Sequence, residues 1–161
     1  MHSIDVTMLR PDEWRAFREI RLGALAEAPY AFGSTLQREQ SLTESEWRHR
    51  LTQRAQFVVN VDGNSVGTAA GMPLPDATSA ELISMWVDPA WRGRGFADLL
   101  VRAVLAWAAG RRLREVRLWV TDGNSRAERL YLRHGFTPTG ERQQVLEDDP
   151  TRWEFRMARG V

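Results

Sequence analysis

Residues 91–100 read Trp-Arg-Gly-Arg-Gly-Phe-Ala-Asp-Leu-Leu, and this stretch joins a predicted strand to a predicted helix. Glycine reaches positive φ without a steric penalty, so Gly93 and Gly95 predict a tight turn. The apolar positions after the turn recur at helical spacing, at Phe96, Leu99, Leu100, Ala103, Val104 and Trp107. A glycine turn that opens a helix is typical of phosphate sites, because a helix N-terminus presents free N–H groups.

Three interpretations of this turn are open. In the first it is an ordinary strand-to-helix loop, whose glycines supply positive φ and whose arginines face water. In the second it is a dinucleotide fingerprint, but that pattern needs glycine at position 98, where Asp98 stands and repels an anion. In the third it is a cradle for the diphosphate of coenzyme A, with Arg92 and Arg94 adding charge-assisted contacts. A P-loop is excluded, because no Gly-Lys-Ser/Thr follows.

The rest of the chain predicts strands and helices on either side of this turn. Apolar alternation and turn signals predict strands at 4–9, 56–61, 65–74, 80–87, 115–120, 136–145 and 151–158. Helical spacing predicts helices at 14–28, 43–53, 95–109 and 125–134, with residues 30–42 irregular. The order β-α-α-β-β-β-α-β-α-β-β predicts an α/β (α+β) fold. We expect a single mixed, mostly antiparallel central sheet of about seven strands, with a parallel pair within 80–120 and helices on both faces.

Composition narrows the class of protein and of site. The chain has 161 residues, 43% of them hydrophobic and 27% charged, so we expect one domain over 1–161. No apolar run is long enough to cross a bilayer, and the start lacks the apolar core of a signal peptide, which predicts a cytoplasmic protein. A net charge of +1 argues against a nucleic-acid partner bound by bulk charge. With no cysteine and three scattered histidines, no metal site is expected.

Two motifs stand in order within residues 81–136. Val87-Asp88-Pro89 is followed by Arg92-Gly-Arg-Gly-Phe-Ala97, which has the form Val-x-Pro and then Arg/Gln-x-x-Gly-x-Gly/Ala. The pattern Asn-x-x-Ala-x-x-x-Tyr-x-x-x-Gly-Phe is filled at every fixed position, by Asn124, Ala127, Tyr131, Gly135 and Phe136. Together the two segments resemble motifs A and B of the GCN5-related N-acetyltransferase (GNAT) superfamily. The element order from 4 to 158 is also similar to that family's fold.

The resemblance implies direct transfer of an acyl group, usually acetyl, from the thioester of coenzyme A to a primary amine. Acetyl-CoA is then the cosubstrate, and its pantetheine arm lies between splayed strands at 80–87 and 115–120. The resemblance assigns the arm to the backbone of Met85, Trp86 and Val87, one of whose N–H groups also stabilises the oxyanion. It assigns the diphosphate to a turn formed by Arg92, Gly93, Arg94, Gly95, Phe96, Ala97 and Asp98.

Asn124 has two competing interpretations. The resemblance implies that its side chain hydrogen-bonds the cofactor arm, whereas an asparagine at the start of a helix is also typical of an N-cap. Ser125 and Glu128 form a capping-box pattern, so we expect Ser125 to be the cap and Asn124 to stay free.

Tyr131 is the predicted proton donor, and Glu81 is a candidate base. Tyr131 follows Asn124 by seven residues, about two helical turns, so both are expected on one side. A phenol with a pKa near 10 can protonate a thiolate whose thiol has a pKa of about 8.5; the alternative is an aromatic core position. Glu81 stands six residues before Val87, where histone acetyltransferases of the family carry a glutamate; the alternative is a solvated strand end. Some N-terminal acetyltransferases of the family carry a glutamate where Trp119 stands here.

The acceptor amine is left open, as is the choice between a monomer and a homodimer. Arg126, Arg129 and Arg133 form a stripe on one helix face, which either meets the 3′-phosphate of the cofactor or is simply solvated. A non-catalytic acyl-CoA-binding sensor on the same fold is the main alternative function. A Rossmann-type nucleotide binder is a more distant one.

Overall fold

The computed structural model describes all 161 residues and contains a seven-stranded sheet in the order β1-β2-β3-β4-β5-β7-β6. The strands are β1 (Ile4–Met8), β2 (Ala55–Val61), β3 (Asn64–Pro73), β4 (Ser79–Val87), β5 (Glu115–Thr121), β6 (Thr137–Gln144) and β7 (Trp153–Gly160). Only β4 and β5 run parallel; every other neighbouring pair is antiparallel. The predicted mixed, mostly antiparallel sheet of seven strands is confirmed.

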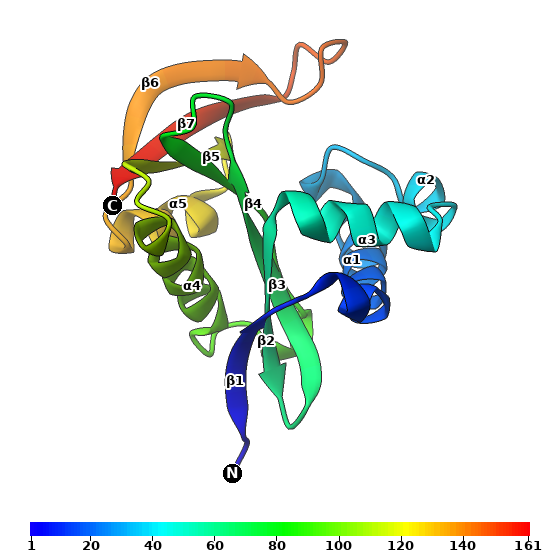
Figure 1. Cartoon of the computed structure of the whole chain (residues 1–161). Helices are drawn as coiled ribbons and strands as arrows, with labels where there is room; N and C mark the ends of the chain where they lie inside the picture. Colours follow the sequence, from blue (N-terminus) through cyan, green and yellow to red (C-terminus); the bar gives the residue numbers. More distant parts are fainter.

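Helices cover both faces of the sheet, as predicted (Figure 1). One face carries α1 (Trp14–Glu27), α2 (Leu36–Gln40) and α3 (Glu44–Gln53), and the other carries α4 (Phe96–Gly110) and α5 (Ser125–Arg133). Short 3₁₀ turns precede α1, follow it and precede the glycine turn, at Pro11–Glu13, Pro29–Ala31 and Pro89–Trp91. None of the helices combines the length and apolar character needed to cross a lipid bilayer.

Helix α2 corrects the expectation that residues 30–42 are irregular. The Thr35 hydroxyl accepts a hydrogen bond from the Arg38 N–H and caps the helix, and Glu39 within it is fully buried. A five-residue helix with a buried carboxylate has no apolar periodicity, so the pattern that finds longer helices does not find this one.

Two apolar cores lie on the two sides of the sheet. The larger one packs α4 and α5 against the sheet, with Leu100, Val101 and Val104 of α4 fully buried. The smaller one packs α1 and α3 against the other face, where the rings of Phe17 and Trp47 meet edge to face at 5.3 Å. The positions of α1, α3, α4 and α5 are therefore set by apolar side chains that face the sheet.

The sheet divides between β4 and β5, and this division shapes the site. The two strands pair only from Ser79 to Glu81, against Glu115 to Arg117. Beyond that point β4 stays paired with β3 as far as Val87, while β5 stays paired with β7 as far as Thr121. In Figure 1, β5, β6 and β7 turn away from the half of the sheet formed by β1 to β4. The β5-facing backbone edge of β4 is therefore left without a strand partner from Leu82 onward.

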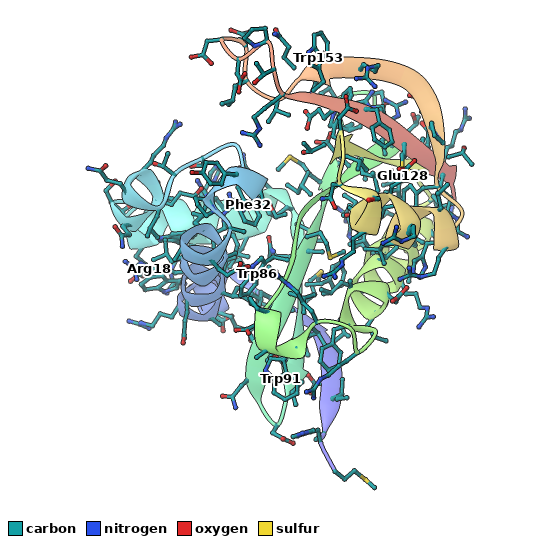
Figure 2. The ribbon with its side chains drawn as sticks, turned by 180° about the vertical axis from the view of Figure 1, so that it is seen from behind. Arg18, Phe32, Trp86, Trp91, Glu128 and Trp153 are labelled. Atoms are coloured by element: carbon teal, nitrogen blue, oxygen red, sulfur yellow. The ribbon has the colours of Figure 1, made fainter.

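A bulge in β4 lies at the start of this unpaired edge. Ile83 pairs with Ala70 and Trp86 with Thr68, so β4 holds one residue more than β3 between these pairs. Ser84, inside the bulge, has a φ of +59°. The extra residue reverses the side-chain alternation, so Trp86 packs toward α1 and Val87 toward α4 (Figure 2).

Candidate active site

A cavity of about 750 Å³ opens where the end of β4, the glycine turn, the start of α4 and helix α5 meet. The residues predicted to hold the cofactor come together there, with Arg94 as the one exception. The cavity is lined by Met85–Val87, by Arg92, Gly93 and Gly95, by Phe96–Asp98 and by Asn124. Its wall is therefore built from the unpaired strand edge and the first turn of a helix, both of which carry free backbone polar groups.

The glycine turn has the geometry that its sequence predicts. Gly93 and Gly95 have φ values of +77° and +83°, and Gly95 is the N-cap of α4. A Cβ atom built on either glycine would meet no other atom within 4 Å, so the space around the turn is open. The partial positive charge of a helix N-terminus borders this space and makes it suitable for an anion.

Arg92 lines the cavity, but its guanidinium already has partners in the protein. Its Nε donates to the Val87 carbonyl at 2.9 Å, and Nη2 donates to Glu27 Oε1 at 2.5 Å. The same Glu27 oxygen accepts from the Trp86 indole N–H at 2.9 Å. The bond from Trp86, with Arg92 adding to it, lowers the pKa of Glu27 against an opposing effect of burial. Glu27 thus ties α1 to the end of β4 and to the glycine turn.

Arg94 is the predicted contact that the structure does not bring to the cavity. Its guanidinium lies over the ring of Trp91, 4.7 Å from the ring centroid. A planar cation on an aromatic face gains a favourable electrostatic contact. Arg94 is therefore not among the residues that line the cavity, and its charge-assisted contact with the diphosphate stays a prediction.

Asp98 stands in the first turn of α4 and is neutralised by the end of α5. Its carboxylate lies 3.1 Å from Arg133 Nη2 and 2.7 Å from His134 Nε2. Burial opposes ionisation, but these hydrogen bonds lower the pKa of Asp98 overall. The repulsion of an anion that Asp98 predicts on its own is thus offset by its partners.

The arginine stripe of α5 faces the cavity. Arg126, Arg129 and Arg133 all line it, and only Arg133 is engaged in an ion pair. Arg126 and Arg129 have no ion-pair partner, so their two guanidinium groups make this side of the cavity, called here the positive rim, positively charged.

Asn124 lines the cavity and is also the N-cap of α5, which corrects the expectation that Ser125 caps the helix. Its side-chain carbonyl accepts from the Ala127 N–H at 3.1 Å. Asparagine is as good an N-cap as serine, so the capping box does not decide between the two residues. Because Oδ1 is used by the cap, the amide nitrogen is the group left for a ligand.

Tyr131 does not line the cavity, although its helix neighbours Ala127 and Leu130 do. Its ring is 6% exposed and packs edge to face on Phe136, with the centroids 5.8 Å apart. The hydroxyl makes no hydrogen bond in the protein. Burial of the ring raises the pKa of the Tyr131 phenol.

Glu81 lies at the point where β4 and β5 separate, outside the cavity lining. It pairs with Met72 of β3 and Arg117 of β5, on the sheet face that also carries Trp119. Burial raises the pKa of Glu81, opposed by the positive charge of Arg156. Glu81 is thus half-buried beside an aromatic ring, which differs from a solvated strand end.

The profile of the acetyltransferase (GNAT) family matches residues 10–136, which include both sequence motifs and every residue that lines the cavity. The chain belongs to this acetyltransferase family. The resemblance found in the sequence is confirmed.

Relatives within the family differ in the compound that their names mention. A mycothiol acetyltransferase of Beutenbergia cavernae is 34% identical over 89 residues, or 55% of this chain and 30% of that protein. An uncharacterized N-acetyltransferase of Mycobacterium bovis is 33% identical over 106 residues, or 65% of this chain and 67% of that protein. Human N-acetylaspartate synthetase is 36% identical over 84 residues, or 52% of this chain and 28% of that protein. The matches thus span only about a third of the mycothiol acetyltransferase and of N-acetylaspartate synthetase.

Solved structures share the whole fold. A GNAT-family acetyltransferase from Streptococcus pneumoniae has a TM-score of 0.78 at 18% identity, covering 99% of this chain and 100% of that one. A Salmonella typhimurium protein solved with its cofactor acetyl-CoA has a TM-score of 0.77 at 17% identity, covering 98% and 93%. The likeness shows the same α/β fold.

Three residues near the site lie outside the two family motifs and were missed by the sequence analysis. Ala28 and Ala31, at the end of α1 and in the 3₁₀ turn after it, line the cavity. Glu27 holds Arg92 and Trp86. They reach the site because α1 packs against the end of β4, and no local pattern signals such a contact.

Proposed function

We propose that this chain transfers an acetyl group from acetyl-CoA to a primary amine, which attacks the thioester directly. The observation that carries the proposal is the cavity itself, where an open glycine turn, two unpaired arginines and an unpaired strand edge meet. These features match, respectively, the diphosphate, the 3′-phosphate and the amide-bearing arm of coenzyme A.

Each part of the chain then has a role. Acetyl-CoA supplies the acetyl group as a thioester, whose carbonyl carbon an amine nitrogen can attack. A backbone N–H within Met85–Val87 donates to the carbonyl oxygen as negative charge grows there. Tyr131 gives its hydroxyl proton to the sulfur as the carbon–sulfur bond breaks. Glu81 accepts, through water, the proton that the amine nitrogen loses as the carbon–nitrogen bond forms.

The tyrosine assignment is supported by its hydroxyl, which has no hydrogen-bond partner in the protein. Burial raises the pKa of Tyr131, so the phenol stays protonated at any neutral or mildly alkaline working pH. Tyr131 follows Leu130, which lines the cavity, and a helical side chain leans back toward the helix N-terminus, where Asn124 lies. We therefore expect the hydroxyl to lean toward the end of α5 that carries the predicted arm contact.

Release of free coenzyme A is a clean test of the function. The sequence has no cysteine, so a thiol reagent detects only the thiol of the product, and it has no lysine that could be acetylated in place of an added amine. We expect acetyl-CoA to raise the melting temperature, and one class of amine to accelerate thiol release. The panel begins with amino acids, as the name of N-acetylaspartate synthetase suggests, and continues with polyamines, aminoglycosides and peptides. Binding without turnover across this panel would contradict transfer, and absence of binding would contradict the cofactor site.

Glu81→Gln tests the base. The raised pKa of Glu81 means that the wild-type rate should rise with pH through a value above 4.5, because only the carboxylate accepts a proton. We expect the variant to lose this rising limb and roughly tenfold or more in kcat/KM. Glu115→Gln, on β5 at the same sheet face, is the matched control and should keep the wild-type profile. A pH profile unchanged by Glu81→Gln removes Glu81 from the mechanism.

Arg129→Ala tests the positive rim. Arg129 has no ion pair to lose, so the change should leave stability unaltered while the Kd for coenzyme A rises roughly three- to tenfold. Calorimetric titration at two salt concentrations measures the effect, which should shrink at high salt. The control is Arg111→Ala, at the C-cap of α4, because the Arg111 guanidinium lies over the ring of Trp107 outside the cavity lining. Equal Kd values for Arg129→Ala and the wild type would place Arg129 outside the cofactor contact.

A further inference from the structure

Arg21 of α1 connects the helices of one face to the bulge of β4. Its Nε and Nη2 donate to the two carboxylate oxygens of Glu39 at 2.9 and 3.0 Å, and its Nη1 donates to Ser84 Oγ at 3.1 Å. The guanidinium also lies over the ring of Phe32, 4.7 Å from the centroid. A planar guanidinium group whose three nitrogens all donate hydrogen bonds has little freedom to move.

Glu39 fixes this arginine from the other side. The Glu39 side chain is fully buried. It forms a second ion pair with Arg50 of α3, whose Nη1 lies 2.9 Å from Oε1. A buried carboxylate between two guanidinium groups holds its place, because losing either partner leaves an uncompensated buried charge. The position of Arg21 is therefore set by α2 and α3 as well as by α1.

Ser84 needs such support. Its φ of +59° lies in the left-handed region, which is unfavourable for a residue with a Cβ and persists only where the surroundings impose it. The Ser84 hydroxyl accepts the hydrogen bond from Arg21 at 3.1 Å. Met85, the next residue, lines the cavity. The conformation of Ser84 therefore decides how the backbone of Met85–Val87 faces the gap between β4 and β5.

We propose that Arg21 is a positioning residue for the transfer reaction, acting through Ser84. It holds the bulge in the left-handed conformation and so fixes the N–H groups that would bind the cofactor arm and the carbonyl oxygen. This inference rests on the proposed function, since it concerns the strand edge assigned to acetyl-CoA. Arg21 itself touches none of the reacting atoms.

Glycine at position 84 gives the decisive test, because it adopts a φ of +59° without support. We expect Arg21→Met to lower kcat/KM for acetyl-CoA roughly tenfold, and Ser84→Ala, which leaves the Arg21–Glu39 pair intact, to lower it in the same direction. Ser84→Gly should stay near the wild type, and Arg21→Met combined with Ser84→Gly should recover most of the loss. Arg48→Met, which removes an exposed ion pair on α3, is the control for loss of an arginine.

The double variant separates positioning from a general structural role. If Arg21→Met lowers kcat/KM equally with serine and with glycine at position 84, Arg21 does not act through Ser84 and the inference is overturned. Crystal structures of the wild type and of Arg21→Met provide a readout that needs no activity. We expect Ser84 to leave the left-handed region in the variant, and an unchanged φ would overturn the inference even if the protein proved not to transfer acetyl groups. A wild type that neither binds nor turns over acetyl-CoA contradicts the proposed function, not the coupling of Arg21 to Ser84.

Discussion

Tyr131→Phe should lower kcat roughly a hundredfold, which is the scale of a lost general acid. The substitution removes only the hydroxyl, and that hydroxyl has no hydrogen-bond partner in the protein. We therefore expect the melting temperature and the Kd for acetyl-CoA to match those of the wild type. Loss of turnover with unchanged stability and unchanged binding is a combination that a core position does not produce.

Tyr30 is the matched control, since it is the only other tyrosine and its side chain is 80% exposed. Tyr30→Phe should keep the wild-type rate. Steady-state kinetics of both variants, with thermal unfolding alongside, make the comparison. If Tyr131→Phe turns over at the wild-type rate, the departing thiolate takes its proton from another donor and Tyr131 is a packing residue beside Phe136.

Glu39→Gln should lower the free energy of unfolding by about 3 kcal/mol at pH 7, because it leaves two guanidinium groups without their carboxylate. Burial raises the pKa of Glu39, but hydrogen bonds from Arg21 and Ser34, together with the charges of Arg21 and Arg50, outweigh it and lower the pKa from 4.5 to about 2. By linkage, a shift of this size is also worth about 3 kcal/mol.

The pH dependence has a definite sign. The folded-state pKa of Glu39 lies below the unfolded-state value, so its stabilisation is complete above pH 4.5 and is lost as the pH falls toward 2. The difference between the wild type and Glu39→Gln should shrink over this window in urea titrations. Glu44→Gln, which removes an exposed pair with Arg48, should change the free energy of unfolding by less than about 1 kcal/mol. A pH-independent difference would mean that Glu39 contributes by packing rather than by charge.

Much of the fold and of the cavity wall was predictable, because the information is local. The hairpin signal Asp62-Gly63 is realised with φ values of +51° and +83°, and the stripe from Phe96 onward became α4. The glycine turn places its residues at the cavity for the same reason, since positive φ and a helix N-terminus are encoded within a few residues.

The parts that the sequence did not predict depend on contacts between distant segments. The bond between Arg21 and Ser84 joins residues 63 positions apart, and the bond between Glu27 and Arg92 joins residues 65 apart. The contact of Arg94 with the face of Trp91 was not predicted, because it depends on how the turn folds back. Asn124 and Ser125 are adjacent and equally good caps, so only the three-dimensional turn decides between them.

Helix α1 reaches β4 through both Arg21 and Glu27, whose side chains contact Ser84 and Trp86. Residues 81–136, which carry both family motifs, are consequently not a self-sufficient cassette. A chimera that imports this segment without a compatible first helix would contain both family motifs. It would lack the two hydrogen bonds that join Arg21 to Ser84 and Glu27 to Trp86. Exchange of parts between relatives should therefore be planned along the pairing of α1 with β4, and not along the boundaries of the motifs.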